Sequence, residues 1–263
     1  MDLHLQDKHI LVTGGSKGIG LACAEAFLQE GARVTLVSRE AANLARARER
    51  LAAFGQHRIH THAADLRDAA AAQAALEAAE ATLGPVDVLV NSAGAAKRTP
   101  ASELTPQAWQ DAMQAKYFSY IHMIDPTIKR MAQRGAGNIV NVVGNGGKVA
   151  SPIHLPGGAA NAALMLASAG LAAAYGPQGI RVNAINPGAT RTERLQEGLA
   201  ADARAQGIDT GEAMQRAVAR IPLGRMAEPE EIARAVLFLA SDAASYITGV
   251  CMTMDGAASP IVV

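Results

Sequence analysis

The stretch TGGSKGIG, residues 13–20, stands directly after the apolar run His9–Thr13 and directly before a segment with helical periodicity. In such a stretch Gly14 permits a tight turn, Gly18 lets the backbone approach a pyrophosphate, and Gly20 allows the helix and strand to pack closely. The helix after it presents free N–H groups and the positive end of its dipole to the phosphates. Because the glycines stand between a strand and a helix, the stretch predicts a dinucleotide site rather than an ordinary turn.

Outward from this stretch, short β-rich runs alternate with helical segments along the 263 residues. The expected strands are His9–Thr13, Arg33–Val37, Arg58–His62, Val86–Val90, Asn138–Val143, Ile180–Ile185 and Val250–Met254. The expected helices are Gly18–Glu30, Ala41–Ala53, Asp68–Leu83, Pro106–Ala132, Ala159–Tyr175 and Pro229–Leu239. This alternation predicts an α/β fold in one Rossmann-type domain, residues 1–263, with a doubly wound, seven-stranded parallel sheet and helices on both faces.

One segment breaks the rhythm. Residues 188–224 contain no strand pattern, carry many charges and read as helical. Long insertions of this kind between regular units are often functional. We therefore expect a substrate lid over the cofactor crevice.

Composition narrows the class of protein. Aromatic residues are only 3% of the chain, so the core is expected to be aliphatic, and the formal net charge of +0 argues against a nucleic-acid-binding surface. Cys23 and Cys251 show no metal-ligand or redox spacing, so no metal site is expected. The N-terminus lacks a signal-peptide pattern. The Ala-rich segment Ala159–Tyr175 contains Asn161 and Ser168, which favours a buried helix over a membrane span. We expect a cytoplasmic protein without membrane or nucleic-acid partners.

The end of the second expected strand bears on cofactor choice. An acidic residue there normally binds the ribose 2′-hydroxyl of NAD, but this chain has Ser38 and Arg39, with no acid before Glu40. Arg39 can form a bidentate contact with a 2′-phosphate and Lys17 can add a point charge. The alternative is two ordinary exposed basic side chains. The pattern favours NADP(H) over NAD(H).

These motifs together resemble the classical short-chain dehydrogenases/reductases over nearly the whole chain. The further matching motifs are Asp65-Leu66, Asn91-Ser92-Ala93-Gly94, IVN at 139–141, GIRVNAINPG at 179–188, Thr192, and EPEEIARAVLFLASDAASYITG at 228–249. The resemblance implies adenine contacts from residues 65–66, a ribose wall and sheet support from 91–94, and a nicotinamide end held by 187–192. The expected cofactor-binding residues are Gly14, Ser16, Lys17, Gly18, Ile19, Gly20, Ser38, Arg39, Asp65, Leu66, Asn91, Ala93, Gly94, Asn161, Pro187, Gly188, Thr190 and Thr192.

The catalytic positions depart from that family. Its members use an Asn, a Ser and a Tyr-x-x-x-Lys pair, and the resemblance puts Lys116, Gly144, Gly157 and Asn161 at those four positions. Positioned acid–base catalysis contributes about 10² to 10⁴ in rate, so ketone reduction by the family's mechanism should be severely impaired. Two glycines also vacate volume beside the nicotinamide, while Asn161 could still hydrogen-bond the ribose.

Two side chains are candidates to replace the lost catalysts. Lys116 shares a helical face with Trp109, Met113 and Tyr120, which should pack inward, so the lysine is expected to point into the crevice. The alternative is that it snorkels to the edge. His154 stands in a loop expected to border the substrate and could act as an acid near neutral pH. The alternative is a solvated loop histidine.

Partners and function stay open at this stage. Basic residues flank the expected pocket mouth and could attract an anionic substrate, although plain surface charge explains them too: Lys97, Arg98, Arg191 and Arg194. The small residues of the helix 159–175 and the family resemblance predict a homo-oligomer, namely a tetramer. Three functions fit: an NADP(H)-dependent oxidoreductase of an unknown small carbonyl or hydroxyl compound with a non-standard active site, a catalytically silent NADP(H)-binding partner or regulator, and a non-redox lyase or isomerase.

Overall fold

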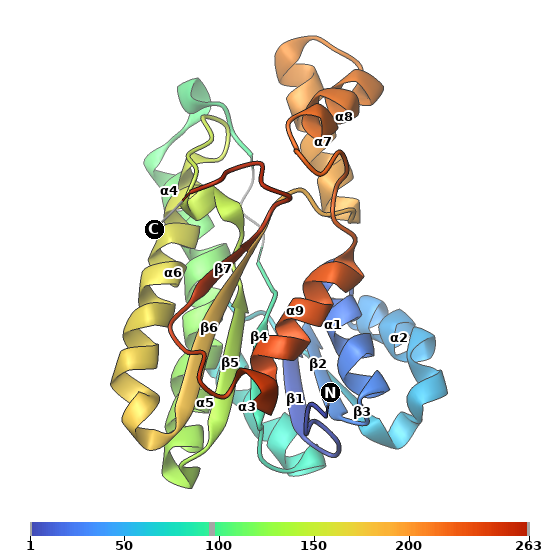
Figure 1. Cartoon of the computed structure of the whole chain (residues 1–263), viewed down its shortest axis with the longest axis vertical. Coiled ribbons are helices and arrows are strands. Elements are labelled where there is room, and N and C mark those ends of the chain that lie inside the picture. Colours follow the sequence, from blue (N-terminus) through green and yellow to red (C-terminus); the bar gives the residue numbers. More distant parts are fainter. Residues whose placement is uncertain (1, 95–97, 262–263) are drawn as a thin grey trace.

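A single parallel sheet organises the chain (Figure 1). The computed structural model describes residues 2–94 and 98–261, so Lys97 lies outside the described residues. The strands are β1 (His9–Thr13), β2 (Arg33–Ser38), β3 (Ile59–Ala63), β4 (Val88–Asn91), β5 (Gly137–Val142), β6 (Ile180–Pro187) and β7 (Cys251–Met254). They form one seven-stranded sheet in the order β3-β2-β1-β4-β5-β6-β7, with every neighbouring pair parallel. The expected doubly wound architecture is confirmed.

Helices cover both faces because successive strand residues point to opposite sides. In β1, Ile10 and Val12 pack into one core, and Leu11 packs into the other. The first core includes α1 (Gly18–Gln29), α2 (Ala41–Arg50) and α9 (Pro229–Ala240). The second includes α3 (Ala69–Leu83), α5 (Ser119–Arg134) and α6 (Leu155–Tyr175). Parallel strands covered on both faces read as continuous apolar runs, which is why the sequence marks them so clearly.

The strand order reverses at β1, which pairs with β2 on one side and β4 on the other. Open α/β sheets bind ligands at such a switch point, outside the carboxyl ends of the strands. The glycine stretch comes directly after β1 and the 91–94 motif after β4, so both motifs meet at this edge.

The helix expected over residues 106–132 is interrupted. It consists of α4 (Pro106–Ala112), a π-helical segment η4 (Met113–Phe118) and α5. A π turn adds a residue to the helical repeat, so α4 is rotated about the helix axis relative to α5. Tyr120 is accordingly fully buried, whereas Trp109 is 40% exposed. The expectation that Trp109 packs inward on the same face as Lys116 is therefore wrong.

The helix expected from Ala159 begins earlier, at Leu155, with His154 at its N-cap and Pro156 in its first turn. Proline is favoured there because the first helical N–H groups have no partner within the helix. By length and composition, the segment Leu155–Gln178 could cross a membrane, with 39% of its most apolar window buried. One face of α6 packs into the core through Leu164, Met165 and Ala172.

The segment 188–224 is helical, as expected, and projects beyond the sheet (Figure 1). It contains α7 (Glu193–Gln206) and α8 (Thr210–Ala219), which share a small core around Leu199 and Ala203. Its two stems are joined by backbone bonds, because Arg191 N donates to Ala227 O at 2.8 Å and Ala227 N donates to Ala189 O at 3.0 Å.

Candidate active site

The glycine loop has the close backbone approach that a dinucleotide requires. Gly14 has φ +66°, and a Cβ there would lie 2.8 Å from Ala93 Cα, so a side chain would push the β1 and β4 loops apart. Lys17 occupies the N-cap of α1 without a side-chain cap, and no acid stands in the first turn. The first N–H groups and the positive dipole end of α1 are thus left for an anion. This loop fits a pyrophosphate.

A cavity of about 260 Å³ opens beside this loop. Its walls include Ser38 at the end of β2, Arg39 after it, Asp65 and Leu66 after β3, and residues 92–94 after β4. Sequence reasoning missed Arg67, which also lines the cavity and hydrogen-bonds the Asp65 carboxylate. That bond lowers the pKa of Asp65. The signal that could have identified Arg67 was its place directly after the Asp65-Leu66 motif.

Buried amides fix the strand ends beneath the cavity. Asn91 accepts from Thr13 Oγ1 at 3.2 Å and donates from Nδ2 to Asn141 Oδ1 at 3.0 Å. Asn141 Nδ2 donates in turn to Ser168 Oγ at 2.9 Å on α6. The chain of bonds links β1, β4, β5 and α6. Asn91 therefore supports the centre of the sheet, and its neighbours Ser92, Ala93 and Gly94 form the cavity wall.

The expected nicotinamide end is built by the turn after β6. Pro187 closes the strand, Gly188 N donates to Met254 O at 2.9 Å, and Thr190 Oγ1 donates to Gly188 O at 3.2 Å. Thr192 caps α7 by accepting from Leu195 N at 3.3 Å. A Cβ on Gly18 would lie 3.2 Å from the Thr192 methyl group, so the base of α7 stands against the glycine loop.

Lys17 was expected to add charge for a 2′-phosphate, but its ammonium contacts the Glu193 carboxylate at 2.9 Å. Both side chains are at least half exposed. The pair joins the glycine loop to the first turn of α7. A phosphate ligand would compete with Glu193 for this lysine.

Lys116 is buried at the carboxyl end of β5, not in bulk solvent. Its Nζ donates to Tyr120 Oη at 2.7 Å and to Val142 O at 3.0 Å, and lies 4.3 Å from the Tyr120 ring centroid. Tyr120 Oη also donates to Val142 O at 2.6 Å. Burial, together with the nearby Arg194 guanidinium, lowers the pKa of Lys116 to about 7. The snorkelling alternative is excluded, while a contact with the nicotinamide stays a prediction.

The other three positions of the expected catalytic set lie close to one another. Gly144 has φ +120°, and a Cβ there would meet Asn161 Nδ2 at 3.2 Å. Asn161 and Gly157 are both buried in the first two turns of α6. The amide of Asn161 therefore occupies part of the space beside Gly144 that the sequence suggested was vacant.

His154 is half-buried rather than fully solvated. A Cβ on Gly146 would lie 3.3 Å from its Cδ2 atom. Its Nδ1 atom is buried and has no hydrogen-bond partner among the described residues. Burial lowers the pKa of His154, and Arg98, Arg194 and Lys116 lower it further.

The expected basic residues of the pocket mouth separate into two groups. Arg194 Nη1 donates to Gly94 O at 2.7 Å, and Arg98 Nη1 contacts Asp202 on α7 at 2.7 Å. Arg191 instead faces Glu228, 3.4 Å away, at the start of α9. Arg194 thus contacts a residue of the cavity wall and Arg98 contacts α7, whereas Arg191 pairs with Glu228, and their part in substrate binding stays a prediction.

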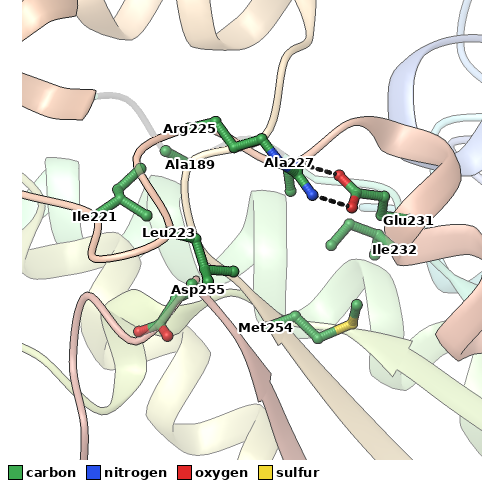
Figure 2. A pocket seen from close by; sticks show the side chains of 10 residues that line it. Ala189, Ile221, Leu223, Arg225, Ala227, Glu231, Ile232, Met254 and Asp255 are labelled. Atoms are coloured by element: carbon green, nitrogen blue, oxygen red, sulfur yellow. Dashed lines mark hydrogen bonds and ion pairs between the residues drawn. The ribbon is translucent and has the colours of Figure 1, made fainter. Parts of the chain in front are cut away.

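A second hollow, of about 180 Å³, lies at the base of the segment 188–224. Figure 2 shows its largely apolar wall, which also includes the Arg225 guanidinium, bound through two nitrogens to the Glu231 carboxylate at 2.7 Å each. This pair holds the chain that follows the segment 188–224 to α9. Across residues 2–94 and 98–261, no three potential metal-ligating side chains gather in one place.

Comparisons with known proteins define the class. A family model described as enoyl-(acyl carrier protein) reductase matches residues 14–258. D-threitol dehydrogenase of Mycolicibacterium smegmatis is 38% identical over 260 residues, which cover 97% of this chain and 94% of that enzyme. The chain belongs to the short-chain dehydrogenase/reductase family.

Two solved structures are similar throughout. L-sorbose reductase from Gluconobacter frateurii, complexed with NADPH and L-sorbose, has a TM-score of 0.92 at 29% identity, covering 100% of both chains. An NADPH-bound short chain oxidoreductase from Pseudomonas aeruginosa, described as containing an atypical catalytic center, has a TM-score of 0.87 at 33% identity. That match covers 97% of this chain and 98% of the other.

Proposed function

We propose that this protein is an NADP(H)-dependent oxidoreductase of small carbonyl or hydroxyl compounds in which Lys116 takes over proton transfer. The observation that carries the proposal is the buried Lys116 ammonium, held by Tyr120 and Val142 O at the carboxyl end of β5. By the family resemblance, we place Gly144, Gly157 and Asn161 at the positions of the family's Ser, Tyr and Lys, so the proposed reaction needs another proton donor. The NADPH-bound Pseudomonas aeruginosa relative with its atypical catalytic center supports such an arrangement.

The cofactor assignment draws on the cavity beside the glycine loop. Arg39 and Arg67 line it, and both can offer planar, bidentate donors to a 2′-phosphate. The bound nicotinamide would supply the hydride donor or acceptor. Both NADPH-complexed structures named above support the choice of NADP(H). Arg39→Asp should reverse the preference between NADPH and NADH, with Arg46→Asp on the exposed face of α2 as the control, measured by calorimetry. Equal wild-type affinities for the two cofactors would refute the choice.

Lys116 has the geometry of a reversible acid. As an ammonium it has three N–H donors, of which two are used by Tyr120 Oη and Val142 O. The third can pass a proton to an alkoxide oxygen as the carbonyl carbon is reduced. The neutral amine keeps the same two bonds and has a lone pair in the third direction, so it can take the proton back from an alcohol or from water. A pKa of about 7 suits both directions, since efficient acid–base catalysts titrate near the working pH.

Tyr120 acts as a positioning residue in this scheme. Burial raises the pKa of its phenol, so it stays protonated and donates to Val142 O while it accepts from Lys116. His154 is the second candidate acid, because its buried Nδ1 atom lies within the same charged surroundings.

We further propose that residues 188–224 act as a lid, and that the protein works as a cytoplasmic homotetramer.

The test measures turnover of a panel of carbonyl compounds, using the loss of NADPH absorbance as the readout. Lys116→Met should lower kcat at least about 10²-fold with little change in NADPH affinity. Lys129→Met on the exposed face of α5 is the matched control and should change neither. The variant His154→Gln, with Lys116 unchanged, tests in the same turnover assay whether His154 is the proton donor. NADPH binding without turnover of any compound would favour a silent partner, and product formation without cofactor oxidation would favour a lyase or isomerase.

A further inference from the structure

The side-chain amide of Asn161 is buried on α6 and has no hydrogen-bond partner among the described residues. Asn161 is 6% exposed, and the other four residues of the stretch 159–163 are alanines. An amide that loses its bonds to water and gains none from the protein destabilises the fold, whereas alanine is the best helix former. The stability of α6 therefore does not explain an asparagine at this position.

Glycines leave open the space that this amide faces. An ideal Cβ would lie 3.2 Å from Asn161 Nδ2 at Gly144 and 3.6 Å from it at Gly146. Gly146 does not have a positive φ, so its backbone conformation does not require a glycine. The nearest atoms to a Cβ there belong to the His154 ring and the Asn161 amide. A side chain at this position would therefore cover the amide.

The glycine-rich stretch 144–147 is fixed on two sides. A Cβ on Gly158 would lie 2.7 Å from Gly146 O, so the stretch lies directly on the backbone of α6. Asn145 Nδ2 donates to Asp255 Oδ2 at 2.9 Å, which joins the stretch to the chain after β7. The amide of Asn161 thus lies between elements that are held together, and donors fixed in this way need no reorganisation when a ligand binds.

Lys116 contacts the chain two residues before Gly144. Its Nζ donates to Val142 O at 3.0 Å, and the π-helical segment η4 that carries it packs against α6. The ammonium and the Asn161 amide therefore both lie at the carboxyl end of β5. Each offers N–H donors to an oxygen atom placed between them.

We infer that Asn161 is a catalytic residue, whose Nδ2 donates a hydrogen bond to the carbonyl oxygen that Lys116 protonates. This inference rests on the proposed oxidoreductase function. As the carbonyl carbon is reduced, its oxygen gains negative charge, which a fixed N–H donor stabilises. The amide keeps both of its protons. The proton that completes the alcohol comes from the Lys116 ammonium, which becomes the neutral amine.

The first experiment requires no turnover. The wild type and Asn161→Ala are saturated with NADP⁺, which cannot reduce a ketone, and mixed with methyl acetoacetate that is isotopically labelled at its ketone carbon. The infrared stretching frequency of the bound ketone should be lower in the wild type, because a hydrogen bond weakens the carbonyl bond. No difference between the two proteins would overturn the inference.

Turnover of the panel of carbonyl compounds is the second readout. Asn161→Ala should lower kcat at least about 10²-fold, the usual effect of removing one donor to a developing oxyanion. The isosteric Asn161→Asp lacks the amide donor, should lose kcat as well, and replaces Asn161→Ala if that variant does not fold. An unchanged kcat would overturn the inference and leave the oxidoreductase standing. No turnover by the wild type would count against the oxidoreductase, while the infrared comparison would still decide the hydrogen bond.

Cofactor affinity separates this role from the ribose contact that the family resemblance implies for Asn161. Calorimetry should give the same NADPH affinity for Asn161→Ala as for the wild type. An affinity at least about 10-fold weaker would assign the amide to the cofactor and overturn the inference.

Stability separates a catalytic amide from a structural one. Asn161→Ala should raise the urea midpoint, since it replaces an unpartnered buried amide with a better helix former. Asn183→Ala is the matched control, because its buried amide donates to Ile247 O at 2.9 Å and accepts from Val250 N at 3.2 Å. That variant should have a lower midpoint and an unchanged kcat. A lower midpoint for Asn161→Ala would show that its amide supports the fold and would contradict the inference.

Discussion

At the scale of single residues, the buried Lys116 side chain destabilises the folded protein. Lys116 is buried with its ammonium bonded to two neutral oxygens, and no carboxylate among the described residues balances its charge. Its pKa is lowered from 10.5 to about 7. Proteins keep such groups mainly where catalysis needs them.

Lys116→Met should therefore stabilise the protein at low pH. Between pH 7 and 10.5 the unfolded chain binds a proton at this lysine that the folded chain does not, so wild-type stability rises with pH across that window. The penalty is fully present below about pH 7, and at about 1.4 kcal/mol per pKa unit its upper limit is roughly 5 kcal/mol. Val142 O keeps a donor in the variant, namely Tyr120.

Urea unfolding at pH 6 and at pH 9.5 measures this effect. The free energy of unfolding of Lys116→Met should exceed that of the wild type at pH 6, and the difference should shrink at pH 9.5. Lys129→Met, which alters an exposed lysine, should show no such trend. A difference that does not change with pH would mean that Lys116 keeps an ordinary pKa.

The backbone conformation of Gly144 also limits which residues can replace it. Its φ of +120° lies in a region that L residues rarely adopt, so a serine cannot be introduced there without strain. Gly144→Ser should lower the free energy of unfolding by about 1–3 kcal/mol. Gly176→Ser is the matched control, because Gly176 has ordinary helical angles and open space around it. Equal unfolding midpoints for the two variants would show that the loop rearranges freely.

At the scale of elements, an ion pair between Lys17 and Glu193 joins the glycine loop to α7. Lys17 must leave Glu193 before it can serve a 2′-phosphate. Glu193→Gln should therefore tighten NADPH binding by up to about fivefold, the usual limit for an exposed pair, with a smaller change for NADH. Calorimetry with both cofactors checks this. Glu212→Gln in the first turn of α8 removes a comparable acid and should change neither affinity.

The elements also show why some features were predictable. The strands and the glycine loop depend on local signals, namely apolar runs and turn residues, and these are confirmed within about two residues. The π turn at 113–118 depends on how the helix packs, so the exposure of Trp109 could not be predicted from periodicity. The early start of α6 had a local signal, Pro156 in the first turn, but the two glycines after it looked like a loop.

The residues of the candidate site likewise fall into those that local motifs predict and those that depend on contacts in the folded chain. Motifs carried by one continuous stretch, such as residues 13–20 and 65–66, could be recognised directly. Arg67, the Lys17–Glu193 pair and the meeting of Arg98 with α7 depend on contacts in the folded chain. No spacing in the sequence encodes those contacts. The sequence thus indicated which residue types were available, and the fold decided which of them meet.

At the scale of the whole molecule, α6 has one face in the core and an apolar face outside it. Leu166 is 77% exposed, and Ala159, Ala162 and Ala173 are exposed on the same side. Small side chains there would let a second helix approach closely, and an apolar stripe of this length is costly to leave in water. We expect a second copy of the chain to cover it, as the predicted oligomer requires.

Leu166→Glu should therefore break the oligomer, because it places charges at the centre of the paired helices. Light scattering at micromolar concentration should give a lower mass for the variant than for the wild type. Leu223→Glu is the control, since Leu223 is 69% exposed at the end of the segment 188–224 and lies outside this face. A wild-type monomer would refute the predicted oligomer. Wild-type protein that sediments with lipid vesicles, while Leu166→Glu stays in solution, would instead show that a bilayer covers the face.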